Sequence, residues 1–454
     1  MSGVRDKLSR IAIIVIFFFV CLYAASSVDI SNAPDEEMRY QLAQFIFENG
    51  YLPEGSESSI INPIWGFSYA FLPFLTSIIS AGFMKAAALF GAAEAALLTA
   101  ARLTSVLSGT GTLIFAFLIG DEIFKNKKYS AFLACAIGFL PQFVFISCYQ
   151  NNDSFAVFTS AVIIYFWILG IKKGWTFGRC IGLGIGCGLC AMSYYNAYVY
   201  ILASVFLFFI SMHSEKRKTS DMVKGGAVVL IVALAIGGWF FVRAAILHNG
   251  DFLGFSSLDA LAEQYAMEGF KPSDIATPSG LGMSFADTFL RSNGFQQTSW
   301  LPTVAGSFIG AFANMTVKLP MILYGAYFGA LLLGILGAIF TAISALKKKT
   351  AENIGVFTAF ICVIVGNVLL FMLYVYFSDY QAQGRYLMPS IIPLMIFITY
   401  GYKGVIEKIT SRRQGKEIVF RQRAATMIVA LLLFIWLVMF VYSYNFVMLP
   451  GCRA

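Results

Sequence analysis

The stretch best suited to chemistry is residues 31–40, which reads SNAPDEEMRY and directly follows the first long apolar run of the chain. It places the carboxylates of Asp35 and Glu36 next to each other in an otherwise apolar sequence. A carboxylate can act as a general base when it reaches the hydroxyl group that it must deprotonate. Acidic residues also favour a helix N-terminus, so a capping role is the structural alternative. The stretch alone leaves both interpretations open.

A second candidate group is Arg385, within residues 380–389 (YQAQGRYLMP), where a later apolar run begins. A guanidinium group there can hold a phosphate through two parallel hydrogen bonds. Gln383 adds a donor, and Gly384 permits close approach of the backbone. The alternatives are an interfacial anchor or an ion pair with Asp379.

Asn152 and Asp153 stand between two apolar runs, where they can cap a helix and also hydrogen-bond a substrate. Taken alone, each of the further outer-side cations is better explained as structural, although together they could neutralise a phosphate; they are Arg102, Arg243, Lys271 and Arg291. His213 and His248 lack the spacing of metal ligands. No nucleotide-binding signature is present, so a soluble nucleotide donor has no visible site.

The composition indicates a multi-pass membrane protein. Of 454 residues, 59% are hydrophobic and 12% charged, whereas soluble domains carry about a quarter charged residues. The net charge of +8 lies in short clusters between apolar runs, which indicates the positive-inside rule rather than nucleic-acid binding. Six of the eight cysteines lie inside apolar runs, so no disulfide framework is expected, although Cys148 and Cys452 could meet outside the membrane.

The basic clusters also predict the topology. If all of them face the cytoplasm, residues 11–27 form an uncleaved first span with a cytoplasmic N-terminus. Residues 67–91 must then lie at the outer interface or re-enter, because a full crossing would put every later cluster on the wrong side. About eleven spans follow, and the predicted ranges are 11–27, 97–120, 129–148, 153–171, two short helices within 180–211, 225–247, 318–346, 354–377, 386–402 and 424–447.

This topology predicts an all-α bundle that forms one domain over residues 1–454. Residues 28–96 form the first extracytoplasmic loop and 248–316 the second. Both loops, the Asn152–Asp153 turn and the segment from Asp379 to Arg385 fall on the same side. Because polar groups at membrane depth are costly and usually functional, we expect a site there.

These motifs together resemble the GT-C glycosyltransferase superfamily, and within it the bacterial DUF2142 and PMT/ArnT-like membrane proteins. The resemblance covers about residues 10–400 and rests on short motifs in a consistent order. The motifs are Asp35-Glu36, Gly50-Tyr51-Leu52-Pro53, Arg102-Leu103-Thr104-Ser105, Pro141 with Asn152-Asp153, Ser307 to Phe312, and Gln383 to Pro389. Many relatives read Asp-Glu-x-x-His, whereas this chain has Arg39 at the His position.

The resemblance implies an enzyme that moves a sugar from a polyprenyl-phosphate carrier to a glycan or glycolipid hydroxyl, usually with inversion. Asp35 would be the general base, and Glu36 would assist it by orienting the acceptor or a basic partner. The implied phosphate-binding residues are Arg385, Gln383, Arg102 and Arg291, and the implied substrate-lining residues are Arg39, Asn152, Asp153, Tyr386 and Trp300. A divalent Mg²⁺ or Mn²⁺ ion is permitted without being required.

The expected location is the bacterial cytoplasmic membrane, with the site on its outer face. A transporter or flippase of a lipid-linked sugar is the main alternative, and it would place binding groups near the membrane midplane in two related halves. A non-catalytic membrane scaffold is the other. The expected partners are the polyprenyl-phosphate-sugar donor, a glycan or lipid-linked acceptor and membrane lipid, and no nucleic acid is expected.

Overall fold

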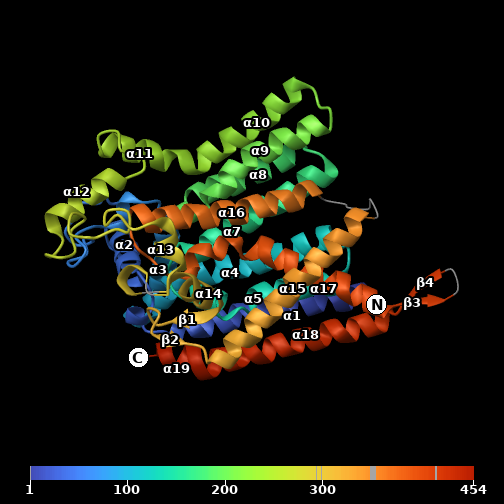
Figure 1. Ribbon diagram of the computed structural model, residues 1–454. Helices are drawn as coiled ribbons and strands as arrows, with labels where there is room; N and C mark the ends of the chain where they lie inside the picture. Colours follow the sequence, from blue (N-terminus) through green and yellow to red (C-terminus); the bar gives the residue numbers. More distant parts are fainter. Residues whose placement is uncertain (1, 293, 298, 348–353, 415–416, 454) are drawn as a thin grey trace.

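The computed structural model describes residues 2–292, 294–297, 299–347, 354–414 and 417–453. The protein is a bundle of long helices that run roughly side by side (Figure 1). The long elements are α1 (Ser2–Ser27), α4 (Glu94–Phe124), α7 (Asp153–Lys173), α9 (Tyr198–Ser214), α10 (Thr219–Ala233), α11 (Trp239–Leu247), α15 (Met321–Lys347), α16 (Ile354–Phe377), α17 (Ile391–Thr410) and α18 (Gln422–Tyr442).

Burial separates inner from outer helices. Most of α4 and α7 is buried, and these two helices pack against each other in the centre of the bundle. Helix α10 has no buried residue in its Thr219–Ala233 span, and most of α18 is likewise exposed. An apolar helix that exposes its side chains in this way is suited to contact with lipid tails.

Nine helices in the described parts of the chain are long and apolar enough to cross a membrane, which confirms an all-α polytopic protein. The two further predicted crossings are shorter. The range 129–148 is broken at Pro141 into α5 (Lys127–Gly138) and α6 (Pro141–Ile146), because proline lacks an N–H for the helix ladder. Helix α8 (Phe177–Ala191) has 15 residues, and residues 192–194 and the turn η3 (Tyr195–Ala197) separate it from α9 as predicted.

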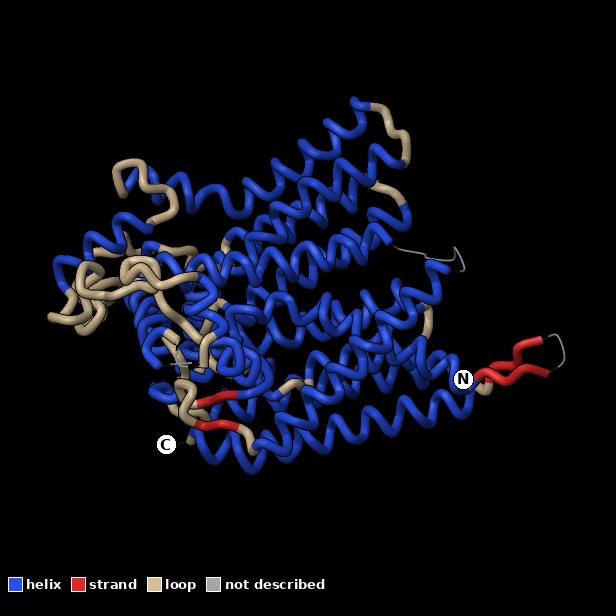
Figure 2. Tube along the Cα trace, viewed as in Figure 1, coloured by secondary structure: helices blue, strands red, loops and turns tan. Residues whose placement is uncertain are grey.

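One end of the bundle carries most of the irregular structure (Figure 2). The elements at this end are η1 (Ile30–Asn32), α2 (Glu36–Asn49), η2 (Tyr69–Phe71), α3 (Leu75–Leu89), α12 (Phe255–Tyr265), α13 (Phe285–Leu290), η5 (Phe295–Gln297), α14 (Trp300–Gly310), the paired strands β1 (Ala311–Phe312) and β2 (Val317–Lys318), and η6 (Gly384–Ser390). Helix α3 packs on α2 and α4, whereas Leu89 and Phe90 at its end are almost fully exposed.

The C-terminal segment returns to the same end. Helix α18 continues through the π-helical turn η7 (Ser443–Met448) into α19 (Leu449–Cys452). The Cys452 carbonyl accepts a hydrogen bond of 2.8 Å from the Asp29 backbone N–H. Similarly, η4 (Leu234–Gly238) joins α10 to α11.

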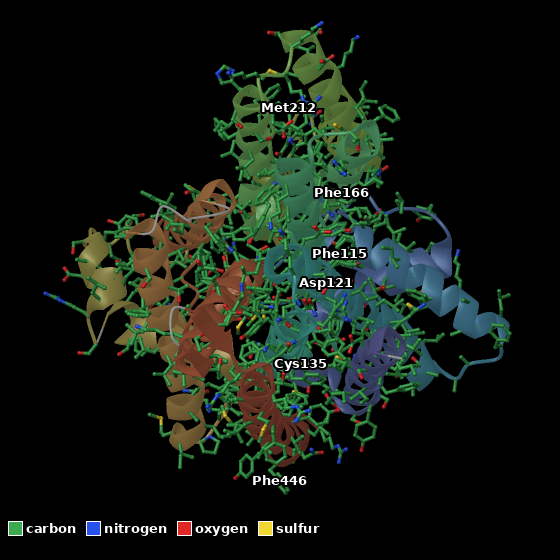
Figure 3. The ribbon with its side chains drawn as sticks, turned by 90° about the vertical axis from the view of Figure 1, so that its right-hand side faces the viewer. Phe115, Asp121, Cys135, Phe166, Met212 and Phe446 are labelled. Atoms are coloured by element: carbon green, nitrogen blue, oxygen red, sulfur yellow. The ribbon has the colours of Figure 1, made fainter. Side chains whose placement is uncertain are left out.

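The opposite end of the bundle holds the N-terminus and the hairpin of β3 (Ser411–Gln414) and β4 (Glu417–Phe420) (Figure 1). Viewed from this end, Asp121 lies near the middle of the face (Figure 3). Its carboxylate pairs with Arg10 at 2.7 Å and Lys127 at 2.9 Å, and Lys173 pairs with Glu122 at 2.6 Å. Three basic clusters that the topology assigns to one side therefore do lie at one end of the bundle.

Candidate active site at the loop-rich end

Asp35 stands at the junction between α1 and α2 with an unusual backbone. Its φ of 61° and ψ of 4° lie in the left-handed region, which aspartate tolerates better than most residues. Although Asp35 occupies the N-cap position of α2, its side chain makes no capping hydrogen bond. Asp35 therefore does not cap the helix through a hydrogen bond, and its carboxylate is directed to other groups.

That carboxylate meets Arg385 from the far end of the sequence. Asp35 Oδ2 lies 2.6 Å from Arg385 Nη2, and Asp153 Oδ2 lies 3.6 Å from Arg385 Nη1. The side chains of Arg385 and Asp153 are 6% and 3% exposed, whereas that of Asp35 is 30% exposed. Three segments separated by more than 100 residues each thus meet in one ion-pair cluster, in which only Asp35 has substantial access.

Arg385 is held in a fixed orientation by its own segment. Its Nε donates to Gln383 Oε1 at 2.7 Å, and its Nη2 donates to the Tyr386 hydroxyl at 3.3 Å. Gly384 N donates to Ser307 Oγ at 2.7 Å, and a Cβ on Gly384 would lie 2.3 Å from the backbone nitrogen of the next residue of α14, Phe308. The glycine thus permits η6 to pack directly on α14, rather than on a ligand.

The surrounding charges favour the ionised form of Asp35. Burial alone would raise the pKa of this carboxyl, but the positive charges of Arg385 and Arg39 outweigh it, so that the pKa lies below its usual value. Burial and the charge of Asp35 raise the pKa of the Tyr69 phenol, which therefore remains a hydrogen-bond donor at neutral pH. Asp35 is thus ionised at neutral pH, as a proton acceptor must be.

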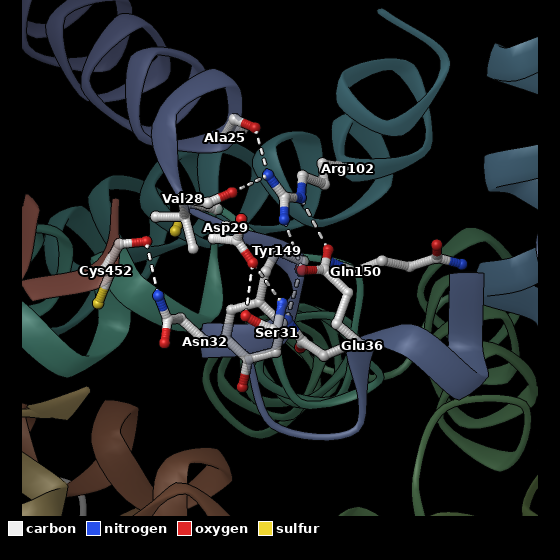
Figure 4. A network of polar contacts seen from close by, with 12 residues as sticks. Ala25, Val28, Asp29, Ser31, Asn32, Glu36, Arg102, Tyr149, Gln150 and Cys452 are labelled. Carbon is white, nitrogen blue, oxygen red and sulfur yellow. Dashed lines mark hydrogen bonds and ion pairs between the residues drawn. The ribbon is translucent and has the colours of Figure 1, made fainter. Parts of the chain in front are cut away.

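Glu36 faces the other way, into the buried network of Figure 4. Its two oxygens accept hydrogen bonds from Arg102 Nε at 2.8 Å and Nη2 at 2.6 Å, and one of them also accepts from Gln150 N at 2.7 Å. Arg102 Nη1 donates to the carbonyl oxygens of Ala25 and Val28. Burial raises the pKa of Glu36, and its hydrogen bonds with Arg102 oppose that rise. The pair joins α1, α2, α4 and the turn before α7.

This network bears on the predicted roles of Glu36 and Arg102. Glu36 is fully buried and Arg102 is 1% exposed, so neither is open to a substrate. The guanidinium predicted to bind a phosphate instead stabilises a helix junction. Glu36 remains next to Asp35 in sequence, and it therefore fixes the start of the segment that presents the Asp35 carboxylate.

Arg39 lies beside the ion-pair cluster and is held by two tyrosine rings. Its guanidinium carbon is 4.1 Å from the ring centre of Tyr69 and 5.6 Å from that of Tyr194, a cation–π arrangement. Burial alone would lower the pKa of Arg39, but the two tyrosines and the carboxylates of Asp35 and Asp153 raise it above its usual value. The structure gives its guanidinium no hydrogen bond to any described residue, although Arg39 is only 5% exposed. Its N–H groups are therefore not committed to a protein acceptor in the described part of the chain.

Three other predicted residues do not join the cluster. Asn152 donates to the carbonyls of Pro73 and Ser193 and accepts from Thr76, so its side chain ties α3 to the turn after α8. Trp300 is buried and donates to the Gln381 carbonyl at 2.8 Å, which supports the loop before η6. Arg291 is 70% exposed and pairs with Asp287 one helical turn away.

Four residues at the site, Tyr69, Tyr149, Tyr194 and Asn196, were not among the predicted ones. Tyr69 and Tyr194 hold Arg39, and the ring of Tyr194 lies 6.1 Å from that of Tyr386. Among the described residues, Asp153 Oδ1, Tyr149 Oη and Asn196 Oδ1 are buried without a hydrogen-bond partner. Such atoms are uncommon in folded proteins and can be satisfied by a ligand. The polar break at residues 193–196, which the predicted topology puts at the outer end of two helices, was the available signal.

A divalent metal fits this cluster poorly. Within the described ranges, no three His, Cys, Asp or Glu side chains gather as a ligand set. Asp35 and Asp153 are the two carboxylates that converge, and both face the Arg385 guanidinium. A Mg²⁺ or Mn²⁺ ion, which the sequence permits without requiring, would have to displace that group.

Comparison with solved structures decides the architecture. The chain is similar to the ArnT protein of Cupriavidus metallidurans bound to undecaprenyl phosphate, with 13% identity, a TM-score of 0.56, and coverage of 98% of this chain and 73% of that one. The protein has the GT-C fold. This finding confirms the predicted resemblance at the level of the fold.

Two structures of an archaeal oligosaccharyltransferase from Archaeoglobus fulgidus share this GT-C fold. The AglB complex with an inhibitory peptide and a dolichol-phosphate has 12% identity and a TM-score of 0.60 over 97% of this chain and 56% of that one. A complex with zinc and sulfate has 12% identity and a TM-score of 0.56 over 96% and 53%. The chain thus spans a little over half the length of the archaeal enzyme.

Sequence comparison gives a match of the same type. The family described as dolichyl-phosphate-mannose-protein mannosyltransferase matches residues 73–239, less than half of the chain. No curated protein matches the sequence. The family match and the fold support the prediction of a GT-C glycosyltransferase, and the narrower resemblance to the DUF2142 proteins stays a prediction.

Proposed function

We propose that this GT-C protein transfers a sugar from a polyprenyl-phosphate carrier to a hydroxyl group of a cell-envelope glycan or glycolipid. The observation that carries the proposal is the cluster of Asp35, Asp153 and Arg385, in which the partly exposed carboxylate of Asp35 is held ionised beside fixed positive charge. The lipid phosphates bound by the ArnT and AglB relatives support a carrier of this class.

In the proposed step Asp35 accepts the proton of the acceptor hydroxyl group. The acceptor oxygen forms a bond to the anomeric carbon of the sugar while the bond from that carbon to the phosphate oxygen breaks. The electron pair leaves with the lipid phosphate. Attack from the side opposite the leaving group inverts the anomeric centre. A positioned general base of this kind contributes roughly 10²- to 10⁴-fold to rate.

The leaving phosphate needs positive charge, and we assign this role to Arg39 and Arg385. Arg39 makes no hydrogen bond to the described residues and is held by two tyrosine rings, so its N–H groups are not committed to a protein acceptor there. Arg385 is fixed beside Asp35 and stabilises the charge that develops on the phosphate. Arg102 and Arg291, whose partners are elsewhere, have no part in this binding.

The position of the cluster argues against a transporter. Asp35 follows the end of α1, Asp153 begins α7 and Arg385 lies in η6, just before α17. The cluster therefore lies at the ends of helices, whereas secondary transporters bind their substrates near the midplane. We place this end of the bundle on the extracytoplasmic face, because the basic clusters gather at the other end.

A reaction in detergent separates the two functions, since a micelle has no compartments to cross. The purified protein would be incubated with polyprenyl-phosphate-linked sugars and a membrane glycolipid extract, and products would be identified by mass spectrometry. A transferase yields an acceptor heavier by one sugar residue together with free polyprenyl phosphate. A transporter yields neither, and that result, obtained with folded protein and a range of donors, would overturn the proposal.

A further inference from the structure

Arg385 occupies the position that a cation bound between two carboxylates would take. Its Nη2 lies 2.6 Å from Asp35 Oδ2 and its Nη1 lies 3.6 Å from Asp153 Oδ2. The two acids come from the α1–α2 junction and from the first turn of α7, so only the folded bundle brings them to the same group. Each acid therefore faces a different edge of one planar cation.

The guanidinium group is positioned before any substrate arrives. Gln383 accepts from its Nε at 2.7 Å, and the hydroxyl of Tyr386 accepts from Nη2. The backbone of the same segment is anchored to α14 through Gly384 and Ser307. A buried arginine held on several sides has little freedom to leave, and its charge does not depend on pH.

Magnesium and manganese ions bind carboxylate oxygens at about 2.0–2.2 Å and need about six ligands in near-octahedral geometry. Asp35 and Asp153 could supply two of them, but the oxygens that would serve are those that face Arg385. Among the described residues no third acidic, histidine or cysteine side chain joins them. A metal ion would thus have to remove a buried guanidinium from both carboxylates.

We infer that Arg385 is a built-in replacement for a divalent metal ion, so that the site binds no Mg²⁺ or Mn²⁺ in the intact protein. The inference rests on the proposed function only for the role of the charge, which is to stabilise the phosphate as it leaves. Whether a metal ion binds between Asp35 and Asp153 can be measured whether or not sugar transfer is observed.

Binding of Mn²⁺ to the full-length protein in detergent tests this directly. After chelator treatment and removal of the chelator, bound Mn²⁺ would be measured by electron paramagnetic resonance for the wild type, Asp35→Asn and Asp153→Asn. The expected result is equal, non-specific binding by all three proteins. A stoichiometric Mn²⁺ site in the wild type that either substitution removes would overturn the inference.

Removing the guanidinium should create the metal site. For Arg385→Ala we expect Mn²⁺ affinity to rise by about tenfold or more, equivalent to at least about 1.4 kcal/mol, and the gain to vanish when Asp153→Asn is added. Arg385→Lys, which keeps the charge, and Lys318→Ala, an exposed cation at the same end, should show no gain. A folded Arg385→Ala protein with wild-type affinity would contradict the inference. If that variant does not fold, the comparison of wild type with the two aspartate variants decides alone.

Discussion

Asp35 shows how the backbone of one residue directs its chemistry. Its left-handed conformation turns the side chain away from the α2 N–H groups that it would otherwise cap and toward Arg385. Conformations of this kind cost of the order of 1 kcal/mol or more and are concentrated at functional sites. The charges of Arg385 and Arg39 then keep the carboxylate ionised.

The lowered pKa of Asp35 predicts how its contribution to the stability of the protein changes with pH. A carboxyl whose pKa is lower in the folded protein adds stability above its ordinary pKa of about 3.9 and loses it as the pH falls below that value. We therefore expect the difference in melting temperature between the wild type and Asp35→Asn to be constant from about pH 7 to 5 and to shrink below about pH 4. Thermal unfolding in detergent at several pH values measures it. A difference that disappears near pH 6 would show that Asp35 is not held ionised.

At the scale of elements, the site depends on two close junctions. The first is the Glu36–Arg102 pair, which joins α2 to α4 and to the end of α1. The second is the contact of η6 with α14 at Gly384. Each junction holds a segment that carries one partner of the Asp35–Arg385 ion pair.

Breaking the first junction should cost stability and activity together. Arg102→Ala leaves the Glu36 carboxylate buried without its cation, a change that typically costs about 3–5 kcal/mol. We expect a large fall in melting temperature and loss of transfer. Adding Glu36→Gln to Arg102→Ala removes the uncompensated charge and should recover part of the stability. A stable Arg102→Ala protein that fails only in lipid-phosphate binding would restore the phosphate role to this residue.

The substitution Gly384→Ala, which adds one methyl group, tests the second junction. The Cβ of Gly384→Ala would lie 2.3 Å from the Phe308 backbone nitrogen and 2.5 Å from the Val304 carbonyl oxygen, so η6 and α14 must separate. Overpacking of this kind costs about 1–3 kcal/mol, and we expect a lower melting temperature and reduced transfer. Gly325→Ala, whose Cβ meets no atom within 4 Å, is the matched control. Equal behaviour of the two variants would show that the contact does not position Arg385.

These junctions also explain what the sequence could and could not predict. Asp35, Asp153 and Arg385 were identifiable because charged residues at the ends of apolar runs are few. The roles of Arg102 and Trp300 were not predictable, since a sequence does not show which carboxylate or carbonyl a buried side chain will meet. Tyr69 and Tyr194 were missed because this chain holds 22 tyrosines and most look alike in sequence.

At the scale of the whole molecule, these ion pairs lie at the two ends of the bundle. The end with the N-terminus holds the pairs of Arg10, Lys127 and Lys173 with acids of α4, and the other end holds the Asp35–Arg385 cluster. The broken segment 129–148 and the 15-residue α8 reduce the number of long spans without changing which ends lie together.

The orientation in the membrane follows from this separation and can be measured in intact cells. Cys362, the one exposed cysteine in the described residues, would first be replaced by alanine. A cysteine introduced in place of Glu54 should then react with a membrane-impermeant maleimide. A cysteine introduced in place of Lys125, at the other end, should react only after the cells are opened. The reverse pattern would place the cluster in the cytoplasm, where the proposed acceptor glycans are absent.

The most direct test of the account is the rate of sugar transfer by Asp35→Asn, measured together with its affinity for polyprenyl phosphate. We expect kcat to fall by about 10²- to 10⁴-fold, as for loss of a general base, while the protein folds and binds the lipid phosphate as the wild type does. Lys318→Ala should match the wild type in both measurements. Wild-type turnover by Asp35→Asn, or a loss of turnover explained entirely by lost lipid binding, would contradict the assignment of Asp35 as the base.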